Sequence, residues 1–358
     1  MKRALPLCLI LLTACGNGVV ALGDAPDSGL PDAGEPDAGP PDSGPPDAGQ
    51  PDAGLPDAGS PDAGPTGIQT VFLILLENHA WGGIKGSSSA PYINGTLLPM
   101  SAHAEGYKGA LSGNLHPSEP NYLWLEAGDN LGVLNDNAPS SNHKAVTDHL
   151  VTLLEAANVS WRSYQEDIAD GACPLTATGN YAPKHNPMVF FDDVIDYGSS
   201  GANPLAPRCL EHVKPLSKLA TDLTAGTAAR YNFITPNQCN DMHTSCAPTS
   251  NEIRQGDDWL ALWVPKILAS PQYQQGGALF ITWDEAEAGS LECVIGNCPI
   301  GMIVLSPLGK TGNYASGVAL DHSSTLKTMQ EIFRVTPLLR HAGDSGVNDL
   351  RDLFVTFP

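Results

Sequence analysis

Three pairs of polar residues have the side-chain types that metal sites and phosphoryl transfer use. They are Glu77-Asn78, Asp284-Glu285 and Asp321-His322. The first two pairs directly follow apolar runs, and the third opens a segment with helical periodicity. Carboxylates gathered at one rim repel each other unless a cation lies among them. We therefore predict a site for one or two divalent metal ions, with hard oxygen and imidazole ligands, and the sequence leaves the identity of the metal open.

Ser118 is the candidate nucleophile. Pro117 and Pro120 restrict the backbone around it, and His116 stands two residues before it. A serine hydroxyl is a weak nucleophile at neutral pH and needs a base or a metal ion to activate it. Histidines in polar segments are candidates for donating to a phosphoryl group or for protonating a leaving alkoxide. Besides His116 these are His185, His243 and His322, of which His322 or His185 is the favoured proton donor.

Four apolar runs predict the strands that must position these residues. They cover residues 71–76, 231–234, 278–283 and 302–305, and helical patterns cover 146–157, 257–269 and 323–333. Buried strands that alternate with helices predict an α/β fold, with a mostly parallel central sheet between helical layers. Active sites of such folds lie at the carboxyl ends of the strands, which is where Glu77 and Asp284 stand.

Six segments occur in a fixed order along residues 68–358. They are Leu75–His79, Ala90–Asn94, His116–Tyr122, Pro236–His243, Thr282–Glu285 and Leu320–Ser324. In this order they resemble the phosphoesterase family that contains bacterial acid phosphatases and phospholipases C, a branch of the alkaline-phosphatase-like superfamily. The resemblance implies a three-layer α/β/α fold of that type and the hydrolysis of phosphate esters.

The resemblance also implies roles for individual residues. Glu77 and Asn78 match the first metal-binding and phosphate-contacting pair, and Asp284 and Glu285 match the second acidic pair on the metal. Ser118 matches the Ser or Thr nucleophile that forms a phosphoryl-enzyme intermediate. The four histidines named above fall in motifs whose histidines line the site. After Glu285 the chain departs from the family's usual pattern, which puts the substrate preference in doubt but not the chemistry.

Three functions stay open at this point. The favoured one is a phosphomonoesterase of the acid phosphatase type, and a phospholipase C acting on lipid head groups is the first alternative. A lipase needs an apolar rim, which Trp81, Trp124 and residues 189–191 are able to supply, although such residues are more often core. The second alternative is a non-catalytic surface module with the same fold, which would have lost the nucleophile or a metal pair.

The amino-terminal residues predict export and lipid anchoring. Lys2 and Arg3, an apolar run over residues 4–12 and a small residue before Cys15 are typical of a secretory signal. The segment resembles the lipobox of bacterial lipoproteins, in which Cys15 becomes the lipidated first residue. We thus expect an exported protein that is attached to a membrane by this lipid, at the outer membrane or cell surface.

Residues 16–66 are predicted to be a disordered linker between the signal peptide, 1–15, and the catalytic domain, 67–358. Eight copies of Pro-Asp-Ala/Ser-Gly lie between Pro26 and Gly64, and this composition offers too little apolar surface for a core. The whole chain has a formal net charge of −21. Such an acidic protein should repel nucleic-acid backbones, so no nucleic-acid partner is expected.

Six cysteines remain in the predicted catalytic domain. An even number in an exported chain favours disulfides, and nearest-neighbour pairing is the simplest of the possible arrangements. A zinc site is the rival interpretation, but no Cys-x-x-Cys or paired-histidine spacing supports it. The expected pairs are Cys173 with Cys209, Cys239 with Cys246, and Cys293 with Cys298.

Overall fold

The computed structural model describes residues 66–287 and 298–358. The signal peptide with Cys15, nearly all of the predicted linker, and Cys293 lie outside these ranges, so the expectations for them stay predictions. The same holds for export and for anchoring at a membrane. Within the described ranges, no helix is long and apolar enough to cross a membrane.

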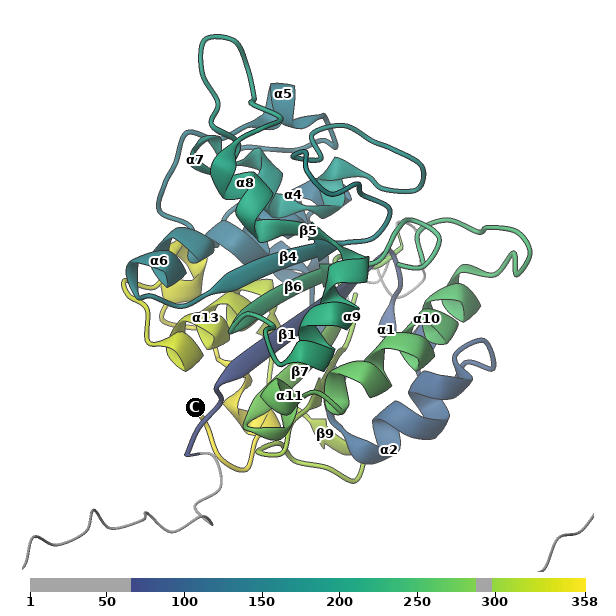
Figure 1. The fold of residues 1–358 in the computed structure, drawn as a ribbon. Coiled ribbons are helices and arrows are strands. Elements are labelled where there is room, and N and C mark those ends of the chain that lie inside the picture. Colours follow the sequence, from purple (N-terminus) through teal and green to yellow (C-terminus); the bar gives the residue numbers. More distant parts are fainter. Residues whose placement is uncertain (1–65, 288–297) are drawn as a thin grey trace, which may run out of the picture. The chain divides into compact units, whose positions relative to one another are not determined.

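An eight-stranded sheet forms the centre of the fold (Figure 1). Its strand order is β5-β4-β6-β1-β7-β8-β2-β9, and all neighbours pair in parallel except where β8 meets β7 and β2. A separate parallel pair joins β10 to β3. The strands are β1 Thr70–Leu76, β2 Ala102–Ala104, β3 Tyr107–Lys108, β4 Trp161–Gln165, β5 Val213–Pro215, β6 Tyr231–Thr235, β7 Gly277–Trp283, β8 Met302–Leu305, β9 Tyr314–Ser316 and β10 Leu320–Asp321.

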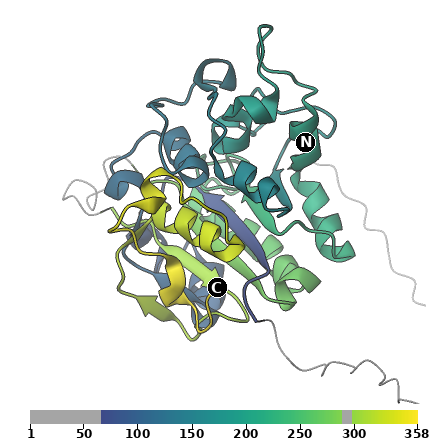
Figure 2. The ribbon, with the colours of Figure 1, turned by 90° about the vertical axis from the view of Figure 1, so that its left-hand side faces the viewer.

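Helices cover both faces of this sheet. Helices α4, α6 and α13 pack together on one face, and α9, α10 and α11 pack on the other (Figures 1 and 2). The longer helices are α4 Ser118–Ala127, α6 Leu150–Ala156, α9 Leu216–Ala225, α10 Glu252–Leu268 and α13 His322–Phe333. The shorter ones are α1 Trp81–Ile84, η1 Ile93–Leu97, α2 Leu98–Met100, α3 Ala110–Gly113, α5 Pro139–Asn142, η2 Pro183–His185, η3 Pro187–Phe190, α7 Asp192–Ile195, α8 Pro207–His212, α11 Pro271–Gln274, η4 Arg340–Gly343 and η5 Leu350–Leu353.

The continuous apolar runs form the central strands, as predicted. Every residue of β1 and β7 is buried, because each strand has helices above and below it. The predicted α/β class, the three layers and the mostly parallel sheet are therefore confirmed. The helix expected over residues 146–157 is shorter, since α6 begins only at Leu150.

Two of the expected disulfides are present. Cys173 bonds to Cys209, and Cys239 bonds to Cys246. Cys298 is also disulfide-bonded, but its predicted partner Cys293 lies outside the described residues. The preference for disulfides over a zinc site is confirmed for the first two pairs.

Candidate active site

The two acidic segments meet at one edge of the sheet because their strands are neighbours. Strands β1 and β7 pair in parallel with Leu76 opposite Trp283, so Glu77 and Asp284 leave the sheet side by side. The amide of Asn78 donates to Asp284 Oδ1 at 3.1 Å. Asn78 has a φ of 55°, a left-handed conformation that asparagine tolerates better than most residues. The sequence-based prediction that these pairs lie together matches this geometry.

Ser118 is the first residue of α4 and points at this edge. Its Oγ donates a hydrogen bond to Glu77 Oε2 at 3.0 Å, and the residue is only 2% exposed. The amino terminus of a helix favours negative charge, since its backbone N–H groups have no partner within the helix. A phosphoryl group on Ser118 would thus lie in a favourable field.

His185 links Glu77 to a further buried carboxylate, Asp241. Its Nε2 lies 3.2 Å from Glu77 Oε1, and its Nδ1 lies 3.1 Å from Asp241 Oδ2. The imidazole also stacks on the ring of Tyr122, with centroids 5.2 Å apart. Ligand atoms of Glu77, His185 and His243 all lie within 4.8 Å of one another. Both predicted histidines therefore reach the same site as the first carboxylate.

His116 lies beside the second acidic residue. Its Nδ1 is 2.6 Å from Glu285 Oε2, and Asn121 Nδ2 donates to the same oxygen at 3.3 Å. The contact with Glu285 raises the pKa of His116 against the opposing effect of burial. The side chain of His116 is 35% exposed, and its Nε2 has no hydrogen-bond partner among residues 66–287 and 298–358. Of the candidate proton donors, His185 and His322 are buried, whereas His116 and His243 are partly exposed.

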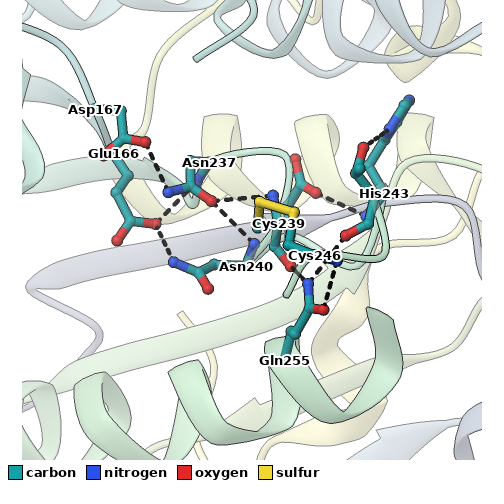
Figure 3. Close-up of a disulfide and its surroundings, with 10 residues drawn as sticks. Glu166, Asp167, Asn237, Cys239, Asn240, His243, Cys246 and Gln255 are labelled. Carbon is teal, nitrogen blue, oxygen red and sulfur yellow. Dashed lines mark hydrogen bonds between the residues drawn. A yellow bond between two sulfur atoms is a disulfide. The ribbon is translucent and has the colours of Figure 1, made fainter. Parts of the chain in front are cut away.

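The loop that carries Asp241 and His243 is fixed by a disulfide and by Gln255 (Figure 3). Gln255 Nε2 donates to the carbonyl oxygens of Cys239 and Thr244, and its Oε1 accepts from the amide of Cys246. The backbone oxygen of Asp241 accepts from the amide of Glu77 at 2.7 Å. Helix α10 thereby holds this loop against the end of β1.

Burial and mutual repulsion keep the carboxylates of the site from ionising easily. Burial, followed by the charges of Asp284 and Asp241, raises the pKa of Glu77 well above its ordinary value. Burial and then Glu285 do the same for Asp284. Burial raises the pKa of Asp241 to about 8 and lowers that of His185 well below its usual range. A cation among these groups would relieve the repulsion.

The residues fit a divalent metal ion. Glu77 Oε1 and Asp284 Oδ2 are buried, yet neither makes a hydrogen bond to any residue that the structure describes. His185 Nε2 is close to Glu77 but is not aligned for a hydrogen bond either. Buried polar atoms without partners are costly and rare, and their convergence is what a cation site requires. Glu77 and Asp284 are the oxygen ligands that this geometry favours, with His185 and His243 as the imidazole ligands.

Asp321 and His322 have other partners. Asp321 accepts from the amide and hydroxyl of Ser324 and so caps α13, and it lines a separate cavity with Lys108. His322 is fully buried, with Nε2 2.7 Å from the backbone oxygen of Asp284 and Nδ1 2.9 Å from Tyr107 Oη. Burial lowers its pKa to about 4. We therefore leave both residues out of the reacting set and assign His322 to holding the Asp284 backbone.

Three residues near the site were not predicted from sequence as site residues. Asp241 stands two positions before His243. This closeness to a candidate histidine is the sequence feature that could have identified Asp241 as a site residue. Lys184 precedes His185 directly, and its Nζ lies 3.4 Å from His243 Nε2. Asp136 comes from a loop with no motif, so nothing in the sequence pointed to it.

Comparison with known proteins agrees with the sequence motifs. Residues 106–336 match the model of the Phosphoesterase family. A probable acid phosphatase from Kluyveromyces lactis is 25% identical over 78% of this chain and 61% of its own length. A phosphatidylinositol-3-phosphatase from Mycobacterium tuberculosis is 26% identical over 74% of this chain and 76% of its own length. The chain thus spans less than two thirds of the first of these relatives. A solved structure of a protein in the alkaline phosphatase superfamily from Vibrio parahaemolyticus covers 78% of this chain and 71% of its own, at 10% identity and a TM-score of 0.49.

Proposed function

The chain belongs to the Phosphoesterase family, and from this premise we propose that it hydrolyses phosphate monoesters through Ser118 with the help of a divalent metal ion. The observation that carries the proposal is the Ser118 hydroxyl, which donates to Glu77 among buried carboxylate oxygens that lack partners. A bound divalent cation would neutralise the phosphoryl oxygens and stabilise the serine alkoxide. The intact serine and acidic pairs argue against the alternative of a non-catalytic module.

The first chemical step forms a bond between Ser118 Oγ and phosphorus and breaks the bond between phosphorus and the leaving oxygen. Glu77 Oε2, which accepts the hydroxyl hydrogen bond, takes the proton of Ser118. The leaving alkoxide takes a proton from His116 Nε2, because His116 is partly exposed and is held by Glu285, whereas His243 is assigned to the metal ion. Water then attacks phosphorus and gives a proton to His116, which restores the protonated imidazole. The bond between phosphorus and Ser118 Oγ breaks, Glu77 returns the proton to Ser118, and phosphate is released.

Further residues orient these groups. Asp241 fixes His185 from the side opposite Glu77, and Tyr122 packs on its ring. Glu285, which accepts from Asn121 Nδ2, holds His116 Nδ1 and so leaves Nε2 directed away from the carboxylate. Because the groups of the site come from five separate segments, small displacements of any one loop should reduce turnover strongly.

A monoester is favoured over a phospholipid because the residues considered for an apolar rim are part of the core. Trp81 is 4% exposed, Trp124 is 3% exposed, and residues 189–191 are fully buried. The names of the two relatives, an acid phosphatase and a phosphatidylinositol phosphatase, also support a phosphatase.

Hydrolysis of p-nitrophenyl phosphate tests the proposal. The full chain is assayed from acid to alkaline pH, with and without a chelator, and the chelated protein is then supplied with single divalent metals. We expect chelator-sensitive release of nitrophenol that a metal restores, and no release by Ser118→Ala. Release of nitrophenol that the chelator does not reduce would contradict the metal requirement. Activity in Ser118→Ala would contradict the assignment of Ser118 as the nucleophile.

A further inference from the structure

Lys184 is a basic side chain beside the site that the reaction above does not use. It belongs to η2, directly before His185, and its side chain is 17% exposed. Its Nζ lies 2.9 Å from Asp136 Oδ2 and 3.4 Å from His243 Nε2. Asp136 therefore holds the ammonium of Lys184 next to His243, an imidazole of the candidate metal site.

The charge of Lys184 acts on the buried carboxylates. Burial raises the pKa of Glu77, Asp241 and Asp284, and Lys184 opposes this effect in each of the three. Burial would lower the pKa of Lys184 itself, but the charges of Glu77 and Asp136 raise it overall. In the geometry of the site, the Lys184 ammonium contacts His243, ligand atoms of His243 and Glu77 lie within 4.8 Å of each other, and Glu77 accepts from Ser118.

Asp136 ties this ammonium to the helix that carries the nucleophile. Its Oδ1 accepts from the amide of Glu119, the residue after Ser118, at 3.0 Å, while its Oδ2 contacts Lys184. Asn142 fixes the loop around Asp136, since its Nδ2 donates to Asn135 and also to Glu119 Oε1 at 2.8 Å. The position of Lys184 relative to Ser118 is therefore set by two consecutive short contacts.

We propose that Lys184, positioned by Asp136, binds a non-bridging oxygen of the phosphoryl group and selects dianionic monoesters over monoanionic diesters. This inference rests on the proposed function and names its substrate class. A monoester has one more negative charge and one more free oxygen than a diester, and an additional ammonium donor stabilises that extra charge. If Lys184 and Asp136 formed only a surface ion pair, the pair would contribute little to the stability of the protein. It would also not distinguish the two kinds of ester.

The test compares the full chain with Lys184→Met, Lys184→Arg and Asp136→Asn. Values of kcat/KM are measured for p-nitrophenyl phosphate and for bis(p-nitrophenyl) phosphate. Lys184→Met should lower the monoester value by about 10- to 100-fold, the range that a hydrogen bond to a charged group contributes. The diester value should change by less than about 3-fold, and Lys184→Arg should recover part of the loss because it keeps the charge. Asp136→Asn should lower the monoester value less than Lys184→Met does.

A matched control and a second readout separate this inference from the proposed function. Lys327→Met removes a lysine that donates to the Val347 carbonyl instead, and it should leave both values unchanged. Calorimetry with inorganic phosphate needs no turnover, and Lys184→Met should weaken phosphate binding at least 10-fold. Equal losses for the two esters, or unchanged phosphate binding, would overturn the inference. If the wild type hydrolyses neither ester, the proposed function fails, and phosphate binding alone still decides the role of Lys184.

Discussion

Replacing Asp284 by asparagine should stabilise the metal-free protein and destabilise the metal-loaded one. Asp284 is fully buried, its Oδ2 makes no hydrogen bond within residues 66–287 and 298–358, and Glu285 repels it. The amide of asparagine keeps an oxygen for the hydrogen bond from the Asn78 amide while it removes the negative charge. In the absence of metal, the variant thus no longer contains this buried, unpaired carboxylate. In the presence of metal, it lacks one of the side chains that would bind the ion.

The expected shifts are measurable. In chelator, removal of the buried charge should add about 1–3 kcal/mol to the free energy of unfolding. This is the usual cost of a buried polar group that lacks a hydrogen-bond partner. For a domain of this size that corresponds to a rise in Tm of about 2 °C per kcal/mol. A metal at 100 times its Kd adds about 2.7 kcal/mol to the wild type. Asp284→Asn should lose most of that gain, so the order of stability reverses between the two conditions.

Thermal unfolding followed by circular dichroism, in chelator and in excess metal, measures both effects. Asp257→Asn is the matched control, because Asp257 is equally buried but accepts from the amides of Tyr92 and Ile93, away from the site. This control should lower Tm in both conditions and leave the metal-induced shift intact. A lower Tm for Asp284→Asn in chelator, or a metal-induced shift equal to that of the wild type, would refute the reasoning.

Four further outcomes are expected. Ser118→Ala should lower kcat at least about 1,000-fold without changing Tm, which steady-state kinetics and thermal unfolding check together. His116→Asn should slow esters with poor leaving groups more than p-nitrophenyl phosphate, as a series of leaving groups would reveal, because only poor leaving groups need a proton. Cys239→Ser with Cys246→Ser should lower Tm and weaken metal binding, measured by calorimetry, since the loop with His243 loses its cross-link. Burial raises the pKa of Glu119 to about 8, so its native form binds a proton that the unfolded chain releases near pH 4. This stability is complete at low pH and is lost as pH rises toward about 8, and Glu119→Gln should flatten that part of a urea-unfolding profile.

Much of the fold follows from features that act locally in the sequence. The apolar runs that became β1 and β7 end at Glu77 and Asp284, and parallel pairing brings strand ends together at one edge. The disulfides Cys173–Cys209 and Cys239–Cys246 were predicted from the even number of cysteines in the domain and from pairing each cysteine with its nearest neighbour. In these cases the physical cause is short-ranged, or it depends only on the order of strands in a sheet.

The side-chain directions at loops and helix ends could not be predicted in the same way. Asp321 stands in a matching motif, but its carboxylate caps α13, which is the ordinary use of aspartate before a helix. Asn94, in another matching motif, donates to the carbonyl oxygens of Ile84, Ser87 and Ala90 and so holds the loop after α1. Motif membership alone does not separate residues that touch substrate from residues that shape the loops around it.

Residues brought in by long loops were missed for a related reason. Asp136 contacts the amino terminus of α4 from a long loop, in which Asn142 donates to the neighbouring Asn135. No periodicity encodes such a contact, and its position depends on loop geometry over many residues. Lys184 was overlooked although its neighbour His185 was predicted, since a lysine in a loop is most often exposed to solvent.

The stereochemical course at phosphorus tests the central claim most directly. A phosphate ester made chiral at phosphorus by isotopic and sulfur substitution is hydrolysed by the full chain, and the configuration of the product is determined. Two successive in-line displacements, first by Ser118 and then by water, predict net retention of configuration. Net inversion would mean a single direct attack by water and would contradict the phosphoryl-Ser118 account.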